Sequence, residues 1–356
     1  MKERAADGEG APIGRRSPVL TIGLNPYGLT YTLGLQGMGT ARANPHGEGL
    51  AGFLRIAREC GAACIELDWR WLTPLRDEEL DRVAEAIGGL PTIYSHWLAH
   101  EPGESIEDAI RRAARIRAGI LRMHLTPVLE GARAAWGGRW HELTRHAREV
   151  LRQDARRVAD AGLVLALENH QDLGSEELLD LAGELGDHVG IVLDTGNPYA
   201  VGEDPVAFTR RAAGRIRHLH LKDYVAQFTD EGFRLVRCAV GDGAVPFAEM
   251  FAALARERDT LTASMEPGAL ESRHIRLFAP EWWNGYPPRE ARELGTMLGR
   301  LRRGALADDA DPRTPWERGA PGPEIVAYER QHIRRSFENM RLVVREASGR
   351  APASDG

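Results

Sequence analysis

The stretch 164–223 decides the fold, because three short apolar runs within it each end on an ionisable residue. These runs are Val164-Leu-Ala-Leu-Glu168, Gly190-Ile-Val-Leu-Asp194 and Ile216-Arg-His-Leu-His220. A fourth run of the same kind, Leu261-Thr-Ala-Ser-Met-Glu266, follows further along the chain. Each run has the composition of a buried β-strand. An ionisable group at the end of a buried strand is costly unless it is paired or binds a metal, so the four end residues are predicted to form one site.

Strand-like runs alternate with segments of helical periodicity along most of the chain. They begin near Val19, Cys64, Thr92, Ile120, Leu163, Gly190, Ile216 and Leu261. This alternation indicates a parallel sheet. Eight units within 18–303 match the length of a closed (β/α)8 TIM barrel, about 250 residues. An open doubly wound sheet is disfavoured, because no G-x-G-x-x-G turn follows the first strand.

Three long segments follow strands and are predicted to form loops on the C-terminal face of the barrel, at 25–49, 127–138 and 224–245. Barrel enzymes keep their active sites on that face. Outside the barrel we expect a disordered lead at 1–17. A linker and an extra C-terminal helix packed on the barrel are expected at 304–346, and a disordered tail at 347–356.

The composition is that of an ordinary globular protein, with 43% hydrophobic and 28% charged residues in 356. A formal charge of −6 disfavours broad binding to nucleic acid. No apolar run approaches the roughly 20 residues of a membrane span. The odd count of 3 cysteines offers no disulfide framework, which favours a reducing compartment and a cytoplasmic location.

Three carboxylates and one imidazole, from Glu168, Asp194, His220 and Glu266, form an oxygen-rich donor set for one divalent cation. Such a set suits Mn²⁺ or Mg²⁺, with Co²⁺ and Zn²⁺ as alternatives. The competing interpretation is that the acids only cap helices or pair with arginines. That interpretation is reasonable for any one of them and weak for all four together.

Four segments resemble the metal-binding strands of the xylose-isomerase-like barrel superfamily. They are Leu167-Glu-Asn-His170, Leu193-Asp-Thr-Gly-Asn197, His218-Leu-His-Leu-Lys-Asp223 and Met265-Glu266. The superfamily includes sugar isomerases and epimerases, inosose dehydratase-like lyases and an apurinic endonuclease branch. The resemblance implies that Glu168, Asp194, His220 and Glu266 bind one ion, with Mn²⁺ the first choice. It also implies that Glu168 and Glu266 move the proton on either face of a keto-sugar.

The chain departs from the epimerase pattern at three places. Asn197 stands where those enzymes usually have a substrate-binding histidine, and Lys222-Asp223 follows His220. His170 lies two residues beyond Glu168, so in a continuing strand it points to the same side. It is either a general base beside the metal or a loop anchor. Similar departures are found in relatives that use the site for elimination, namely catalytic (alpha) subunits of C-glycoside deglycosidases and decarboxylases of 3-oxo sugar acids.

We therefore expect a metal-dependent enzyme that abstracts a proton next to the carbonyl of a sugar, as an isomerase or epimerase forming an enediolate. A lyase acting on a 3-oxo glycoside or 3-oxo sugar acid is the alternative. The candidate substrate-binding residues are Glu66, His96, Asn197, Lys222, Arg273 and Trp283. The expected partner is a small carbohydrate, with a homo-oligomer or a small partner subunit left open.

Overall fold

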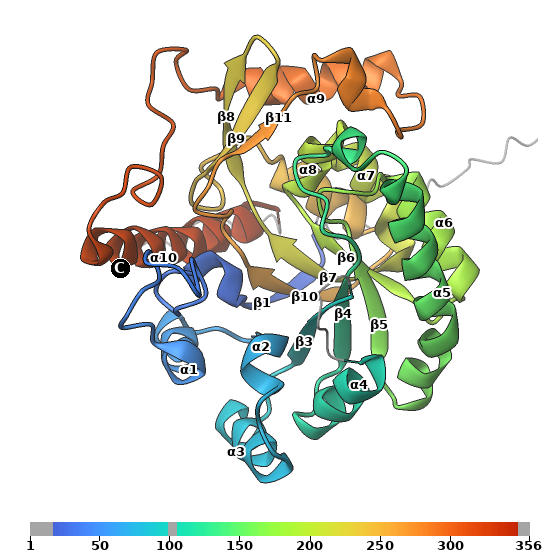
Figure 1. Ribbon diagram of the computed structural model, residues 1–356, viewed down its shortest axis with the longest axis vertical. Helices are drawn as coiled ribbons and strands as arrows, with labels where there is room; N and C mark the ends of the chain where they lie inside the picture. The colour runs from blue at the N-terminus through green and yellow to red at the C-terminus, as the bar shows by residue number, and fades with distance from the viewer. Residues whose placement is uncertain (1–16, 99–104, 348–356) are drawn as a thin grey trace, which may run out of the picture.

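The computed structural model describes residues 17–98 and 105–347, so the expected lead and tail lie almost wholly outside the described residues. Eight parallel strands form a closed barrel (Figure 1). They are β1 (Val19–Leu24), β2 (Ile65–Asp68), β3 (Thr92–Trp97), β4 (Ile120–His124), β5 (Val164–Glu168), β6 (Gly190–Asp194), β7 (Ile216–Leu221) and β10 (Thr260–Met265). The predicted fold class is confirmed.

The barrel closes between its first and last strands. β1 pairs with β10 over its whole length, from Val19 opposite Thr260 to Leu24 opposite Met265. On its other side β1 meets β2 at one position, Leu24 opposite Ile65. Gly23 permits this approach, because a Cβ there would lie 1.9 Å from the carbonyl oxygen of Cys64. A glycine inside a strand often marks such a close approach of two backbones.

Helices cover the outside of the barrel. Those between strands are α1 (Gly49–Cys60), α2 (Trp69–Leu72), α3 (Asp77–Ile87), α4 (Ile106–Arg115), α5 (Arg139–Asp160), α6 (Ser175–Leu185), α7 (Pro205–Ala212) and α8 (Phe247–Leu254). Short 3-10 turns are η1 (Pro26–Leu29), η2 (Arg133–Trp136), η3 (Asn197–Val201), η4 (Ala213–Arg215) and η5 (Pro280–Trp283). Among the described helices, none combines the length and apolarity needed to cross a bilayer.

A small antiparallel sheet stands beside the barrel mouth. Its strands are β8 (Tyr224–Thr229), β9 (Gly232–Arg237) and β11 (Arg273–Ile275), with β9 in the middle. The first two form an antiparallel hairpin within the segment 224–245, which was expected to be a loop. Helix α9 (Ala291–Arg303) lies against this sheet rather than on the barrel wall (Figure 1).

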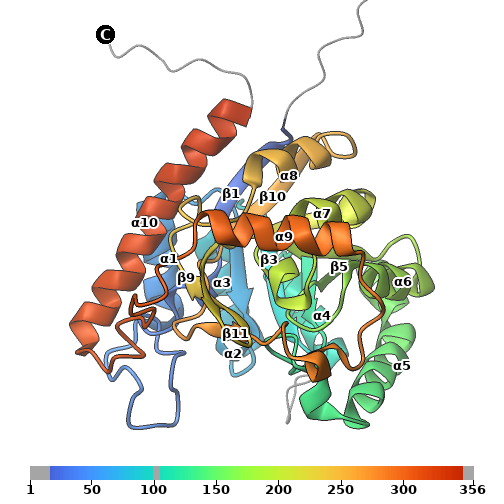
Figure 2. The same ribbon diagram turned by 90° about the horizontal axis from the view of Figure 1, so that it is seen from above.

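The last helix, α10 (Gly322–Ala347), packs along β10, α8 and η1 (Figure 2). It therefore takes the place of the eighth wall helix, between α8 and α1, although it was expected as an addition to a finished barrel. The buried Glu329 of α10 accepts hydrogen bonds from the backbone N–H groups of Tyr31 and Thr32, at 3.0 and 2.7 Å. α10 thus also holds the loop that follows η1.

Candidate active site

Four buried side chains from four different strands converge inside the mouth of the barrel. Glu168 ends β5, Asp194 ends β6, His220 belongs to β7, and Glu266 follows β10 directly. One ligand atom from each lies within 4.8 Å of the others. The residues proposed from sequence as metal ligands are therefore neighbours in space, as parallel strands ending at one rim require.

His220 lies at the centre of this cluster. Its Nδ1 is 3.1 Å from Glu168 Oε1 and 2.9 Å from Glu266 Oε2, and its Nε2 is 2.9 Å from Glu66 Oε2. Burial disfavours the charged imidazole, but the carboxylates of Glu66 and Glu266 outweigh it and raise the pKa of His220 well above its ordinary value. Glu66 thereby fixes the ring from below, as a carboxylate behind a metal-binding histidine does.

Lys222 brings a positive charge to the other side of the cluster. Its Nζ lies 2.5 Å from Asp194 Oδ2 and 2.8 Å from Glu266 Oε1. The second oxygen of Asp194, Oδ1, accepts from the backbone N–H groups of Gly196 and Asn197. Burial raises the pKa of Asp194 to about 6, against the opposing effect of Lys222.

These residues fit a divalent metal ion. The donors are three carboxylates and an imidazole, the set expected for a hard or borderline cation. Asp194 Oδ2 and Glu266 Oε2 are buried and accept no hydrogen bond within the described chain, although cationic groups lie close to both. A cluster that draws an ammonium group between two carboxylates attracts cations, and this suits it to a divalent ion.

A buried arginine pairs with Glu168 and was not predicted. Arg122, in the middle of β4, donates from Nη2 to Glu168 Oε2 and from Nη1 to Ser95 Oγ at 2.6 Å. Burial opposes ionisation of Glu168, but Arg122 and then His220 hold its pKa well below its ordinary value. Arg122 lies within the strand-like run Ile120-Leu-Arg-Met-His124, and a charge buried in a strand is costly unless it is paired. This argument could have identified Arg122 from the sequence.

A cavity of about 260 Å³ opens above the cluster on the C-terminal face. Its lining includes Tyr27, His124, His170, Lys222, Glu266 and Arg273. The cluster is thus reached from the face where the fold places its chemistry. The cavity lies at the small end of ligand sites, which typically begin at about 300 Å³, and so it suits a monosaccharide.

Two histidine rings form one wall of this cavity. The rings of His124 and His170 lie 3.9 Å apart between centroids, and His124 also stacks on Trp97 at 5.1 Å. Burial lowers the pKa of His124 to about 3 and lowers that of His170 well below its ordinary value, so both are neutral. His124 Nε2 and His170 Nδ1 are buried without a hydrogen-bond partner in the described chain. His124, two residues after Arg122, was also missed from sequence.

The six candidate substrate-binding residues are placed differently by the structure. Lys222 and Arg273 line the cavity. Glu66 lies beneath His220, and His96 is buried at the end of β3 outside the lining. Two others have local partners: Asn197 donates to the carbonyl oxygen of Asn169, and Trp283 donates to that of Leu277 while its ring packs edge-on against Trp282.

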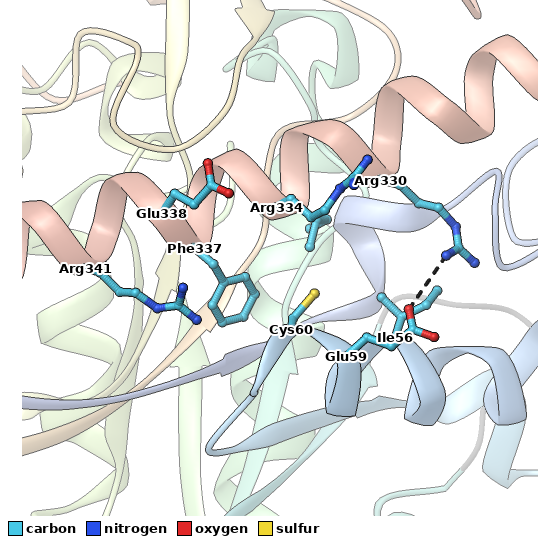
Figure 3. Close-up of a pocket in the computed structure, with 9 residues that line it drawn as sticks. Ile56, Glu59, Cys60, Arg330, Arg334, Phe337, Glu338 and Arg341 are labelled. Carbon is cyan, nitrogen blue, oxygen red and sulfur yellow. Dashed lines mark ion pairs between the residues drawn. The ribbon is translucent and has the colours of Figure 1, made fainter.

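A second cavity, of about 390 Å³, lies in the groove between α1 and α10 (Figure 3). Its lining includes Glu59, Cys60, Arg330, Arg334, Glu338 and Arg341. Within the described ranges, both groups of histidines and carboxylates spaced for a metal lie inside the barrel. We therefore place the chemistry at the barrel mouth and not in this larger groove.

Residues 54–283 match the family described as "Xylose isomerase-like TIM barrel". The chain belongs to this family. The rhizopine catabolism protein MocC of Rhizobium meliloti is 32% identical over 116 residues, which cover 29% of this chain and 36% of MocC. The uncharacterized protein YihM of Escherichia coli K12 is 27% identical over 151 residues, covering 40% of this chain and 41% of YihM. The matched part thus spans about two fifths of these relatives.

A solved D-psicose 3-epimerase, crystallised in the presence of D-fructose, superposes with a TM-score of 0.52. The match covers 83% of this chain and 94% of the epimerase, with 15% sequence identity. At this identity the likeness concerns the fold.

Proposed function

We propose that the protein is a divalent-metal-dependent enzyme that abstracts a proton next to the carbonyl of a sugar or keto-sugar, as an isomerase or epimerase. The observation that carries this proposal is the buried donor set of three carboxylates and one imidazole beneath a cavity walled by a neutral histidine. Membership of the xylose isomerase-like family supports it. The free thiols of Cys60, Cys64 and Cys238 support a cytoplasmic location.

Glu168, Asp194, His220 and Glu266 would hold the ion, with Mn²⁺ the first candidate. When bound, the ion polarises the substrate carbonyl as a Lewis acid. Lys222, already between Asp194 and Glu266, places a positive charge where an oxyanion develops during proton abstraction.

The proton is moved by His170 and Glu266. A general base needs reach to the substrate proton. Glu168 meets this need poorly, because its two carboxylate oxygens face Arg122 and His220 and it lies outside the lining of the cavity. His170 is neutral, lines the cavity and has a ring nitrogen without a partner in the described chain. Glu266 lines the same cavity and is the candidate for the other face of the sugar.

A lyase is the second candidate. The adjacent neutral rings of His124 and His170 favour it, because a neutral imidazole that takes the substrate proton becomes an imidazolium, which can then give that proton to a leaving group. The cavity volume of about 260 Å³ favours a sugar acid that loses CO₂ over a glycoside with a large aglycone.

The test is turnover with Mn²⁺ in D₂O, followed by NMR, on ketoses, 3-oxo-glucosides and 3-oxo sugar acids. Deuterium at one carbon with an intact skeleton identifies an isomerase or epimerase, and release of CO₂ or an aglycone identifies a lyase. His170→Gln and Glu266→Gln should each lower the rate about 10²- to 10⁴-fold. His141→Gln, on the exposed side of α5, is the matched control. Unchanged rates in both site variants would contradict the proposed roles.

A further inference from the structure

Arg273 differs from the other cations around the active-site cavity. It begins β11, where it pairs with Leu235 of β9, so its backbone is held in a sheet. Its side chain is half-buried and lines the same cavity as Glu266 and Lys222. A guanidinium in that place can reach a molecule lying over the metal-binding cluster.

Each of the three other cations that line the cavity is matched by carboxylates. They are Arg70 on Asp68, Arg122 on Glu168, and Lys222 on Asp194 and Glu266. Arg273 has no ion-pair partner within 17–98 and 105–347, and its buried Nε has no hydrogen-bond partner there. Its charge is thus the one cationic charge of the described lining that no carboxylate of the described chain neutralises.

Acidic residues close to Arg273 in the chain or in the sheet have other partners. Glu271 accepts from Gln36 Nε2 at 2.8 Å and from Trp316 Nε1 at 2.9 Å. Glu130 accepts from the backbone N–H of His274 at 3.1 Å. Neither carboxylate is paired with Arg273, although both lie in the same part of the structure. Leaving a partly desolvated guanidinium without an anion costs free energy, which a ligand can recover.

We infer that Arg273 binds an anionic group of the substrate, a carboxylate or a phosphate carried by a monosaccharide whose other end lies over the cluster. This inference rests on the proposed function and narrows its substrate class to acidic sugars. The planar fork of an arginine matches both anions with two parallel hydrogen bonds. A cavity of about 260 Å³ leaves room for one such sugar.

Calorimetric titration of the full chain tests this with three probes that share a ring: D-glucuronate, D-glucose 6-phosphate and D-glucose. Each is titrated with and without Mn²⁺. We expect one of the two anions to bind about ten- to a hundredfold more tightly than D-glucose, the range for a charge-assisted hydrogen-bonded pair. The preferred anion tells carboxylate from phosphate.

Two variants test whether Arg273 is the residue that causes the preference for an anionic sugar. Arg273→Gln should bring the anion to within about threefold of D-glucose, while Arg276→Gln, an exposed arginine on the same segment, should keep the preference. No preference in the wild type, no binding of any probe, or a preference that survives Arg273→Gln would overturn the inference. A preference lost in Asp194→Asn but kept in Arg273→Gln would also overturn it, because the anion would then be bound by the metal.

Failure of the inference can be told apart from failure of the proposed function. A separate calorimetric titration with Mn²⁺ alone, in the absence of sugar, measures metal binding by the wild type and its loss in Asp194→Asn. If the metal binds and the anion preference is absent, the proposed function stands and the substrate is a neutral sugar. If the metal does not bind, the proposed function fails whatever Arg273 does.

Discussion

Replacing Arg122 by methionine removes the guanidinium that pairs with Glu168 and leaves a buried carboxylate facing an apolar chain. Both side chains are buried, with exposed fractions of 4% and 0%. Removing one partner of a buried ion pair costs about 3–5 kcal/mol. We therefore expect Arg122→Met to lower the free energy of unfolding of the metal-free protein by about that amount.

In Arg122→Met, Glu168 keeps His220 as a partner, and the loss of stability depends on whether a metal ion is also bound. Glu168 Oε1 stays 3.1 Å from His220, and a divalent ion in the cluster would add a stronger counter-charge. Saturating Mn²⁺ should therefore stabilise Arg122→Met more than it stabilises the wild type. The double variant Arg122→Met, Glu168→Gln removes both charges and should recover much of the lost stability without metal, since a neutral replacement of a buried pair is often tolerated.

Urea unfolding followed by circular dichroism, with and without Mn²⁺, measures these differences. Arg145→Met is the control, because this arginine pairs with Glu149 on the surface and should change stability by less than about 0.5 kcal/mol. The reasoning fails if Arg122→Met without metal unfolds within about 1 kcal/mol of the wild type. It also fails if the double variant is no more stable than the single one.

Three further substitutions test other parts of the structure. Glu329→Gln should lower the free energy of unfolding by about 1.5–3 kcal/mol in denaturant titrations, because the buried carboxylate accepts hydrogen bonds from two backbone N–H groups. An unchanged free energy of unfolding would refute the role of Glu329 in holding the loop that follows η1. Burial lowers the pKa of His332 to about 3, so between pH 3 and 6.5 the unfolded chain binds the extra proton and stability falls as pH falls. From pH 7 to 5 the wild type should lose about 2 kcal/mol more than His332→Gln, and equal losses would contradict the assignment. Gly23→Ala should prevent closure at β2 and give little folded protein, whereas Gly183→Ala, in open space on α6, should be neutral or stabilising by up to about 1 kcal/mol in thermal melts.

The gathering of Glu168, Asp194, His220 and Glu266 at one place could be predicted from sequence because its evidence is local. An ionisable residue at the end of an apolar run is visible in the run itself, and parallel strands ending at one rim bring such residues together. Glu168, Asp194, His220 and Glu266 all follow that rule. The eight strands and the closed barrel were predicted from the alternation of strand-like runs with segments of helical periodicity.

The partners of the cluster depend on how neighbouring strands are staggered, which no local pattern reports. Arg122 reaches Glu168 across the β4–β5 pair, and His124, at the end of β4, contacts His170, two residues beyond the end of β5. Trp283, which follows the last barrel strand in the chain, was expected to bind the substrate. In the structure its ring packs against Trp282, its indole N–H donates to the carbonyl oxygen of Leu277, and it lies outside the lining of the cavity. Position along the chain therefore indicated the face of the barrel and not the direction of a side chain.

The placement of α10 was not visible in its periodicity. An amphipathic helix after a linker can pack anywhere on an apolar surface, and here it fills the wall between α8 and α1. Glu329 is the residue that explains this choice, because it supplies the carboxylate that the backbone of Tyr31 and Thr32 requires.

The hydrogen bonds between Glu329 and the backbone of Tyr31 and Thr32 have a consequence for folding during synthesis on the ribosome. The ribosome releases the N-terminal part of a chain first, whereas a domain generally folds as a unit. Here β1 must wait for β10, and the Tyr31–Thr32 backbone must wait for Glu329, some 300 positions later. Contacts this distant in sequence form slowly. In a nascent chain halted before α10, the loop that follows η1 would lack Glu329. We expect chaperones to bind such a chain until α10 has left the ribosome.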